Sequence, residues 1–242
     1  MKNIEFEKRN KDNIKLMSKD QHLKNITKEW YNAGYKYEYS YHFTWLGRPI
    51  IQYPQDMIAI QEIIWQVKPD LIIETGIAHG GSLIFSASIL ELLGHGEVLG
   101  IDVDIREHNR VEIEKHPMYK RITMIEGSSI SKDVAKKVYK FSEDKKRILV
   151  FLDSNHTHQH VLKEIKLYSP LVSKGSYIVV FDTMVEDLSP QFLTNRPWDK
   201  HNNPKTAIRE FLKTNHRFKV DNTLDTKLLI TSCLGGYLKC IK

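Results

Sequence analysis

The sequence predicts an α/β fold in which helices cover both faces of a mostly parallel sheet. From residue 70 onward, short apolar runs alternate with longer amphipathic segments, the pattern of repeated strand–helix units. Glycine-rich or acidic residues follow several of the predicted strands, and the carboxyl ends of parallel strands share one edge of a sheet. These two observations favour a doubly wound sheet with a ligand site at that edge.

The composition is that of a soluble globular chain. Of its 242 residues, 27% are charged and 41% hydrophobic, and no apolar run is long enough to cross a bilayer. The first residues are too charged for the apolar part of a signal peptide, so we expect a cytoplasmic protein without a membrane span. Cys233 and Cys240 have neither a zinc-binding nor a redox spacing, and both are expected in the core.

The first part of the chain differs from the rest. Residues 1–55 are expected to form an N-terminal appendage or lid, with one or two weakly amphipathic helices before residue 35. From Tyr35 to Trp45, aromatic and polar side chains alternate, which predicts an extended strand with one aromatic face. That face is also suited to cover a nearby sugar site as a lid. From Asp56 to Val67, apolar residues at helical spacing predict a helix that Lys68-Pro69 ends.

Residues 56–242 are expected to form the ligand-binding domain. The parallel strands are predicted at Leu71–Glu74, Val98–Asp102, Ile122–Ile125, Ile148–Asp153 and Tyr177–Asp182. Helices are expected to begin near Ser82, Arg106, Ser131 and Thr157. Phe218–Val220 and Leu228–Thr231 are predicted as a closing antiparallel hairpin, because the connection between them is too short for a helical crossover.

The first predicted strand runs into a glycine-rich turn, Glu74-Thr75-Gly76-Ile77-Ala78-His79-Gly80-Gly81-Ser82. Glycines allow backbone to approach a ligand, and the following helix N-terminus offers free N–H groups. The spacing matches neither the dinucleotide fingerprint nor a P-loop. Asp102, at the end of the second strand, can accept both hydroxyls of a ribose, and Ser128 and Ser129 follow the third strand where an adenine would lie.

Acidic and imidazole groups follow the fourth and fifth strands. Asp153 and His156 are expected to face one cavity, where the imidazole takes a hydroxyl proton while the carboxylate binds a cation or the acceptor. Asp182 brings a second carboxylate, and two carboxylates with waters suit Mg²⁺. The alternatives are a helix-capping Asp153 with surface histidines, above all His158 and His160, and a loop cap at Asp182.

Four segments together resemble the cephalosporin hydroxylase family: GRPIIQYPQDMIAIQEIIWQVKPDLIIETGIAHGGS, LGIDVDI, FLDSNHTH and GSYIVVFDT. The resemblance covers roughly residues 45–235. Despite its name, the family contains Rossmann-like class I S-adenosylmethionine-dependent methyltransferases, among them sugar O-methyltransferases that act on rhamnosyl groups. It implies a seven-stranded sheet of order 3-2-1-4-5-7-6 whose seventh strand is antiparallel.

The resemblance also implies roles for individual residues. Glu74, Gly76 and Ser82 would line the methionine end of S-adenosylmethionine, Asp102 its ribose and Ser128 or Ser129 its adenine; the wider cofactor-binding set adds Thr75, His79, Gly80 and Asp153. Asp153 and Asp182 match metal-ligand positions of metal-dependent members. Those members have an acidic pair at the end of the fifth strand, but Phe181 precedes Asp182 here. Either extra waters complete a Mg²⁺ site, or Glu186 or Asp187 compensates, or no metal binds.

The expected function is therefore methyl transfer from S-adenosylmethionine to a sugar hydroxyl in the biosynthesis of a capsule, lipopolysaccharide or other surface polysaccharide. His156 and Asp153 are the expected catalytic residues, and the acceptor is a saccharide or another small molecule. The sequence leaves open whether the protein forms a homo-oligomer. One alternative is an Fe(II)/2-oxoglutarate hydroxylase whose metal ligands are Asp153, His156 and His158. Another is a binding module that retains the cofactor pocket but is not catalytic, because Phe181 stands where metal-dependent members have an acidic residue. An RNA methyltransferase is favoured only by the net charge of +6, which we assign to solvated surface.

Overall fold

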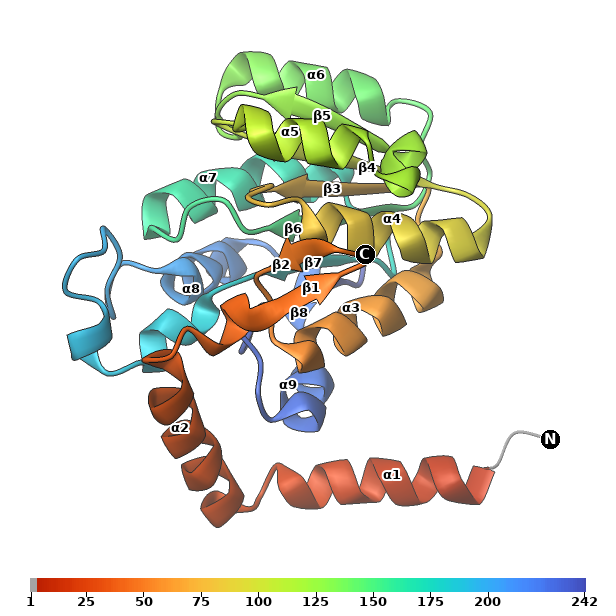
Figure 1. Cartoon of the computed structure of the whole chain (residues 1–242). Helices are drawn as coiled ribbons and strands as arrows, with labels where there is room; N and C mark the ends of the chain where they lie inside the picture. Colours follow the sequence, from red (N-terminus) through yellow and green to blue (C-terminus); the bar gives the residue numbers. More distant parts are fainter. Residues whose placement is uncertain (1–3) are drawn as a thin grey trace.

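The computed structural model describes residues 4–242, and its centre is one mixed sheet (Figure 1). The strands are β3 (Leu71–Thr75), β4 (Glu97–Asp102), β5 (Ile122–Glu126), β6 (Ile148–Leu152), β7 (Tyr177–Val180), β8 (Phe218–Val220) and β9 (Tyr237–Cys240). Their spatial order is β5-β4-β3-β6-β7-β9-β8, with β9 antiparallel to both neighbours and the other pairs parallel. Counted from β3, this is the order 3-2-1-4-5-7-6, so the predicted fold is confirmed.

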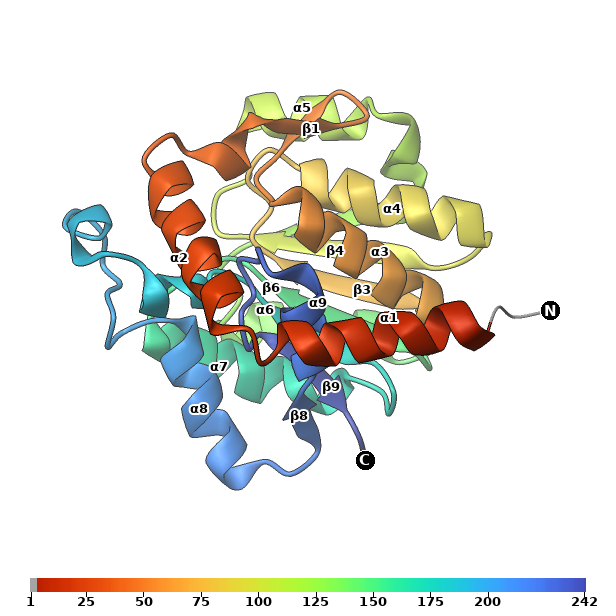
Figure 2. The same ribbon diagram turned by 90° about the horizontal axis from the view of Figure 1, so that it is seen from below.

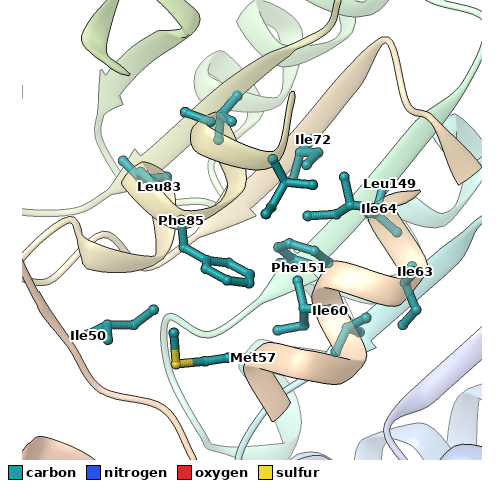
Figure 3. Packing of buried hydrophobic residues seen from close by; sticks show 14 of the residues in the cluster. Ile50, Met57, Ile60, Ile63, Ile64, Ile72, Leu83, Phe85, Leu149 and Phe151 are labelled. Carbon is teal, nitrogen blue, oxygen red and sulfur yellow. The ribbon is translucent and has the colours of Figure 1, made fainter. Parts of the chain in front are cut away.

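Helices cover both faces of the sheet because its strands are apolar on both sides. In β3, Ile72 packs in one buried cluster while Leu71 and Ile73 pack in the other. The first face is covered by α3 (Pro54–Val67), α4 (Gly81–Leu93) and α5 (Glu107–Glu114). The second is covered by α6 (Lys132–Ser142), α7 (His158–Tyr168) and α8 (Pro204–Thr214). Figure 3 shows Met57 and Ile60 of α3 packing toward Phe85 and Phe151.

Local signals set the ends of several helices. Ser131 caps α6 by accepting a hydrogen bond from the Val134 N–H, and Asn203 forms a capping box with Thr206 at α8. Lys68 ends α3 in the left-handed conformation immediately before Pro69. Short 3-10 helices complete the domain: η2 (Pro117–Arg121), η3 (Ser169–Leu171), η4 (Thr183–Asp187) and η5 (Pro190–Phe192).

Within residues 4–242, the segment before residue 36 forms two helices, as predicted for the first part of the chain. They are α1 (Ile4–Met17) and α2 (Gln21–Tyr35), and Asp20 caps α2 by accepting from the Leu23 N–H at 2.9 Å. No residue of α1 is buried, and Figure 2 shows this helix running across α9 (Asn222–Leu228). After α2 come η1 (Tyr39–His42) and a two-stranded hairpin of β1 (Phe43–Trp45) and β2 (Arg48–Ile50).

The extended strand predicted from Tyr35 to Trp45 is wrong for most of its length. Tyr35 ends α2, η1 follows, and only the last three residues form strand. Tertiary packing overrides the period of two: Tyr39 packs against Trp30 and Tyr53, with ring centroids 5.0 and 6.1 Å away, whereas Tyr41 stays 51% exposed. The aromatic rings therefore do not share one face.

The strand predicted at Leu228–Thr231 is also wrong, because Leu228 ends α9 and the final strand is β9. The cause is the buried carboxylate of Asp56, which accepts hydrogen bonds from the Ser232 N–H at 2.7 Å and the Tyr237 hydroxyl at 2.7 Å. The chain after α9 is bound to that carboxylate before it can enter the sheet. The antiparallel closing pair is present as predicted, with its second strand shifted to later residues.

Within residues 4–242, no helix is both long and apolar enough to span a membrane.

Candidate active site

A cavity of about 280 Å³ opens beyond the carboxyl ends of β3, β6 and β7. Its walls come from the β3–α4 turn, the segment after β6, the segment around η4 and the residues between α2 and α3. It brings together these predicted site residues: Gly76, His79, Ser82, Asp153, His156 and Asp182. These residues follow the carboxyl ends of β3, β6 and β7, the edge of the sheet at which a ligand site is expected from the sequence.

Glycines bring the β3–α4 turn close to β6. Gly76 has φ +90°, and a Cβ there would lie 2.1 Å from the Asp153 carbonyl oxygen. Gly80 has φ +80°, and a Cβ there would lie 2.4 Å from the Ile113 side chain. Larger residues at either position would push the turn away from its neighbours.

Two residues that the sequence analysis did not assign to the site hold this turn. Arg48 donates to the His79 carbonyl oxygen at 2.6 Å and to the Asn109 amide oxygen at 3.1 Å. Asn109 in turn donates to the Ala78 carbonyl oxygen at 3.0 Å. Neither residue forms a motif with the turn, since both lie about 30 positions from it in the chain. Only the folded chain reveals this contact.

Glu74 and Thr75 are buried at the end of β3. The Glu74 side chain is 2% exposed, and one of its carboxylate oxygens accepts a hydrogen bond from the Ser82 hydroxyl. Burial raises the pKa of Glu74 to about 7, and the bond from Ser82 partly opposes that rise. Its other oxygen and the Thr75 hydroxyl have no partner among the described residues. A second, smaller cavity is lined by Glu74 and shares Gln52, Ser82 and Asp153 with the first.

The predicted ribose and adenine residues lie outside the cavity lining. Asp102 accepts hydrogen bonds from the backbone N–H groups of Ile77 at 2.7 Å and Ala78 at 3.3 Å, so its carboxylate fastens the β3–α4 turn. Ser129 is buried, with its hydroxyl 3.1 Å from the His160 ring nitrogen, and Ser128 is half-buried beside it. Their roles toward a cofactor therefore stay predictions.

Asp153, His156 and Asp182 form the chemical centre of the cavity. One ligand atom from each lies within 4.8 Å of the other two. His156 Nε2 is 3.1 Å from Asp182 Oδ2, and the Gln52 amide donates to Asp153 at 3.3 Å. Burial, and next the negative charge of Asp182, raise the pKa of Asp153 well above its ordinary range. This set offers two carboxylates and one imidazole to a cation.

Other residues considered for this centre lie elsewhere. Glu186 pairs with Arg209 and Asp187 with Lys205, each at 2.6 Å, and among the described residues neither belongs to the group formed by Asp153, His156 and Asp182. His158 is bound to Thr206 and Glu210 on α8, which leaves the centre without the two histidines of an oxygenase triad. His158 and His160 were also expected as surface histidines, but their side chains are only 18% and 20% exposed.

Aromatic side chains and one arginine form the outer wall of the cavity, and sequence motifs do not reveal them. Trp198 meets the His156 ring edge-on, with centroids 4.7 Å apart, and the Arg196 guanidinium lies 5.5 Å from the Trp198 ring centroid. Tyr35 and Tyr41 line the same side. Burial raises the pKa of both tyrosines, so their hydroxyls remain hydrogen-bond donors at neutral pH.

Comparison with known proteins shows which protein family matches this chain. The family described as rhamnosyl O-methyltransferase/CmcI matches residues 37–241. A rhamnosyl O-methyltransferase of Mycobacterium leprae is 30% identical over 157 residues, covering 64% of this chain and 65% of that protein. One of Mycobacterium bovis is 33% identical over 147 residues, covering 59% of this chain and 57% of that protein. The matched region thus spans less than two thirds of either relative.

Solved structures share the fold. The structure described as "cmcI-N160 SAH" is 18% identical, with a TM-score of 0.59 and 83% of both chains covered. An O-methyltransferase from Bacillus cereus in complex with SAH is 16% identical, with a TM-score of 0.53 and 92% of both chains covered. At these identities the likeness concerns the arrangement of the sheet and its helices.

Proposed function

Because this chain belongs to the rhamnosyl O-methyltransferase/CmcI family, we propose that it is an S-adenosylmethionine-dependent O-methyltransferase that acts on a sugar hydroxyl. The observation that carries the proposal is the cavity in which the β3–α4 turn meets Asp153, His156 and Asp182. A methyl donor and a group that can take a proton must lie side by side for this reaction. The biosynthesis of a surface polysaccharide is the proposed setting.

The buried end of β3 fits the amino-acid part of the cofactor. Glu74 and Thr75 each keep a buried oxygen that has no partner within residues 4–242, and an ammonium or other N–H group satisfies such oxygens. In this proposal Glu74, Thr75, Gly76, His79, Gly80 and Ser82 bind that part, Asp153 lies beside the reacting end, and Asp102 with Ser128 or Ser129 binds the nucleoside. When bound, S-adenosylmethionine supplies a methyl group that its sulfonium has already activated.

The chain's own task is then to orient the acceptor and to move one proton. His156 takes the proton from the acceptor hydroxyl, and the Asp182 carboxylate, 3.1 Å from its Nε2, stabilises the imidazolium that forms. Trp198, packed on the His156 ring, holds the imidazole in place and keeps water from that side. The aligned oxygen and methyl group need little further assistance.

The same carboxylates suit Mg²⁺. Asp153 and Asp182 would hold the ion, because carboxylate oxygens and waters are its preferred ligands. When bound, Mg²⁺ would polarise the acceptor hydroxyl. Burial, and next the negative charge of Asp182, raise the pKa of Asp153, and a bound cation would relieve both effects.

The N-terminal segment is proposed to form the acceptor side of the site. Residues 1–55 contribute Tyr35, Ser40 and Tyr41 to the cavity, and Arg48 holds the β3–α4 turn. Residues 56–242 carry the sheet and the proposed cofactor-binding residues. The division into a lid and a methyltransferase domain rests on this distribution of roles.

Thermal unfolding with and without S-adenosylhomocysteine tests the proposal, with each sample measured in Mg²⁺ and in EDTA. A ligand at about 100 times its dissociation constant adds about 2.7 kcal/mol to the free energy of unfolding, so a clear rise in Tm is expected. Asp182→Asn should remove any Mg²⁺-dependent part of that rise and keep the part due to S-adenosylhomocysteine. An unchanged Tm at saturating ligand would contradict the methyltransferase proposal.

A further inference from the structure

Arg196 stands out among the basic residues near the cavity. It is the single lysine or arginine among the described residues that line the cavity, and within residues 4–242 no carboxylate lies close enough to pair with it. The next basic residues near the site differ, since Lys205 is paired with Asp187 and Arg209 with Glu186. The cavity thus contains one cation whose hydrogen-bond donors are not used by a protein acid.

The segment that carries Arg196 is held at both ends. Before it, the Phe192 ring packs against Tyr35, with centroids 5.1 Å apart. After it, the Asn202 side chain accepts a hydrogen bond from the His158 N–H at 2.8 Å, at the first residue of α7. These anchors keep residues 193–201 over the outer side of the cavity. Arg196 is exposed at this outer wall, where a solute can reach it.

Two ring contacts link the Arg196 guanidinium to His156 through the Trp198 indole. The guanidinium lies 5.5 Å from the Trp198 centroid, and that ring lies 4.7 Å from the His156 centroid. The guanidinium and the imidazole therefore both contact the Trp198 indole, which places them at the same wall of the cavity. The Tyr35 and Tyr41 hydroxyls on the same wall can donate further hydrogen bonds to an acceptor.

The charges of the cavity are therefore separated. Asp153 and Asp182 lie at the strand ends, and Arg196 lies across Trp198 at the outer wall. A neutral sugar would leave the guanidinium without a counter-charge, whereas a carboxylate or a phosphate matches its planar pair of donors. The two acids at the strand ends would repel the same anion, which fixes the direction in which the acceptor enters.

We propose that the acceptor is an anionic saccharide, whose carboxylate or phosphate binds Arg196 while the hydroxyl to be methylated faces His156. This inference rests on the proposed function and adds the chemical class of its acceptor. The shared chemistry is the anion, and its source can be a uronic acid or a sugar phosphate.

Binding measurements on the full chain saturated with S-adenosylhomocysteine test the inference. Isothermal titration with methyl glucuronide, glucose 1-phosphate and methyl glucoside compares a carboxylate, a phosphate and a neutral sugar. At least one anionic sugar should bind about 10- to 100-fold more tightly than methyl glucoside, as expected for a charge-assisted hydrogen-bonded pair. If only one of the two anionic sugars binds, the result identifies whether the anion is a carboxylate or a phosphate.

Variants separate Arg196 from general effects of charge. Arg196→Gln should abolish the preference for the anionic sugar, and Arg196→Lys should retain part of it, because a lysine keeps the charge but not the planar donors. Lys200→Gln is the matched control, since it removes one charge from an exposed residue of the same segment that does not line the cavity. It should leave the preference unchanged.

Several outcomes would overturn the inference. These are equal affinity for all three sugars, no binding of either anionic sugar, and a preference that survives Arg196→Gln. Weaker binding of S-adenosylhomocysteine to Arg196→Gln would also overturn it, because Arg196 would then hold the cofactor's own carboxylate. If S-adenosylhomocysteine does not bind even the unmodified chain, the proposed function fails and this inference fails with it. If S-adenosylhomocysteine binds normally but no anionic sugar is preferred, the inference about the acceptor is refuted and the proposed function is not.

Discussion

Replacing Glu74 by glutamine should make the protein more stable at alkaline pH. Burial raises the pKa of Glu74 from 4.5 to about 7. A group whose pKa is higher in the folded state stabilises that state below its unfolded pKa, and the stabilisation is lost as the pH rises through the folded pKa. At about 1.4 kcal/mol per pH unit, the loss amounts to about 3 kcal/mol between pH 4.5 and a pH above 7.

Urea denaturation of the wild type and Glu74→Gln at several pH values between about 5 and 8.5 measures this loss. Glutamine has nearly the shape of a protonated glutamate, so the two proteins should differ little at low pH. The difference in the free energy of unfolding should grow with pH in favour of the variant and level off above about 7. Taking the difference cancels the other titrating groups.

A matched control is Glu91→Gln. Glu91 is at the surface, and its hydrogen bonds with Lys120 and Arg121 lower its pKa, a shift opposite to that of Glu74. A difference curve for Glu74→Gln that stays flat between pH 5 and 8.5, like that of the control, would refute the assignment of a raised pKa. If Glu74 holds the cofactor's ammonium, the same variant should also bind S-adenosylhomocysteine more weakly at pH 8.

Two further predictions concern the cavity. His156→Ala should lower turnover by about 10²- to 10⁴-fold if the imidazole is the base, with the S-adenosylhomocysteine-induced rise in Tm retained; near-normal turnover would exclude that role. Gly76→Ala should lower the free energy of unfolding by about 2–5 kcal/mol. An alanine would be strained at the φ of +90°, and its Cβ would lie 2.1 Å from the Asp153 carbonyl oxygen. Gly175→Ala has a similar φ of +86° with open space around it and should cost only about 1–2 kcal/mol, so equal losses in urea denaturation would contradict the clash.

The parallel part of the sheet could be predicted from the sequence because its signal is local. Buried strands such as Leu71–Thr75 and Ile148–Leu152 are apolar on both faces, and each predicted parallel strand lies within about two residues of the observed one. The glycines and acids that follow these strands are local signals too, and they placed Gly76, Asp153 and Asp182 at one edge of the sheet.

The structure of two segments, residues 35–45 and the chain after Leu228, could not be predicted in this way. The rings of Tyr39 and Trp30 pack together, and the carboxylate of Asp56 binds the chain at Ser232, which lies 176 positions away. These contacts overrode the alternation after Tyr35 and moved the last strand to Tyr237–Cys240. Propensity is a weak preference, and burial of rings and of a carboxylate outweighs it.

The sequence by itself determined the alternation of parallel strands and helices from residue 70 to residue 180, the glycine turn after the first of these strands and the acids at the later strand ends. Only the tertiary structure decided that His156 lies beside Asp182, that Arg48 and Asn109 hold the turn, and that the segment with Trp198 covers the cavity. It also decided the burial that raises the pKa of Glu74. The physical reason is that periodicity reports which side of a segment is buried, whereas contacts, desolvation and pKa depend on which distant segments bury it.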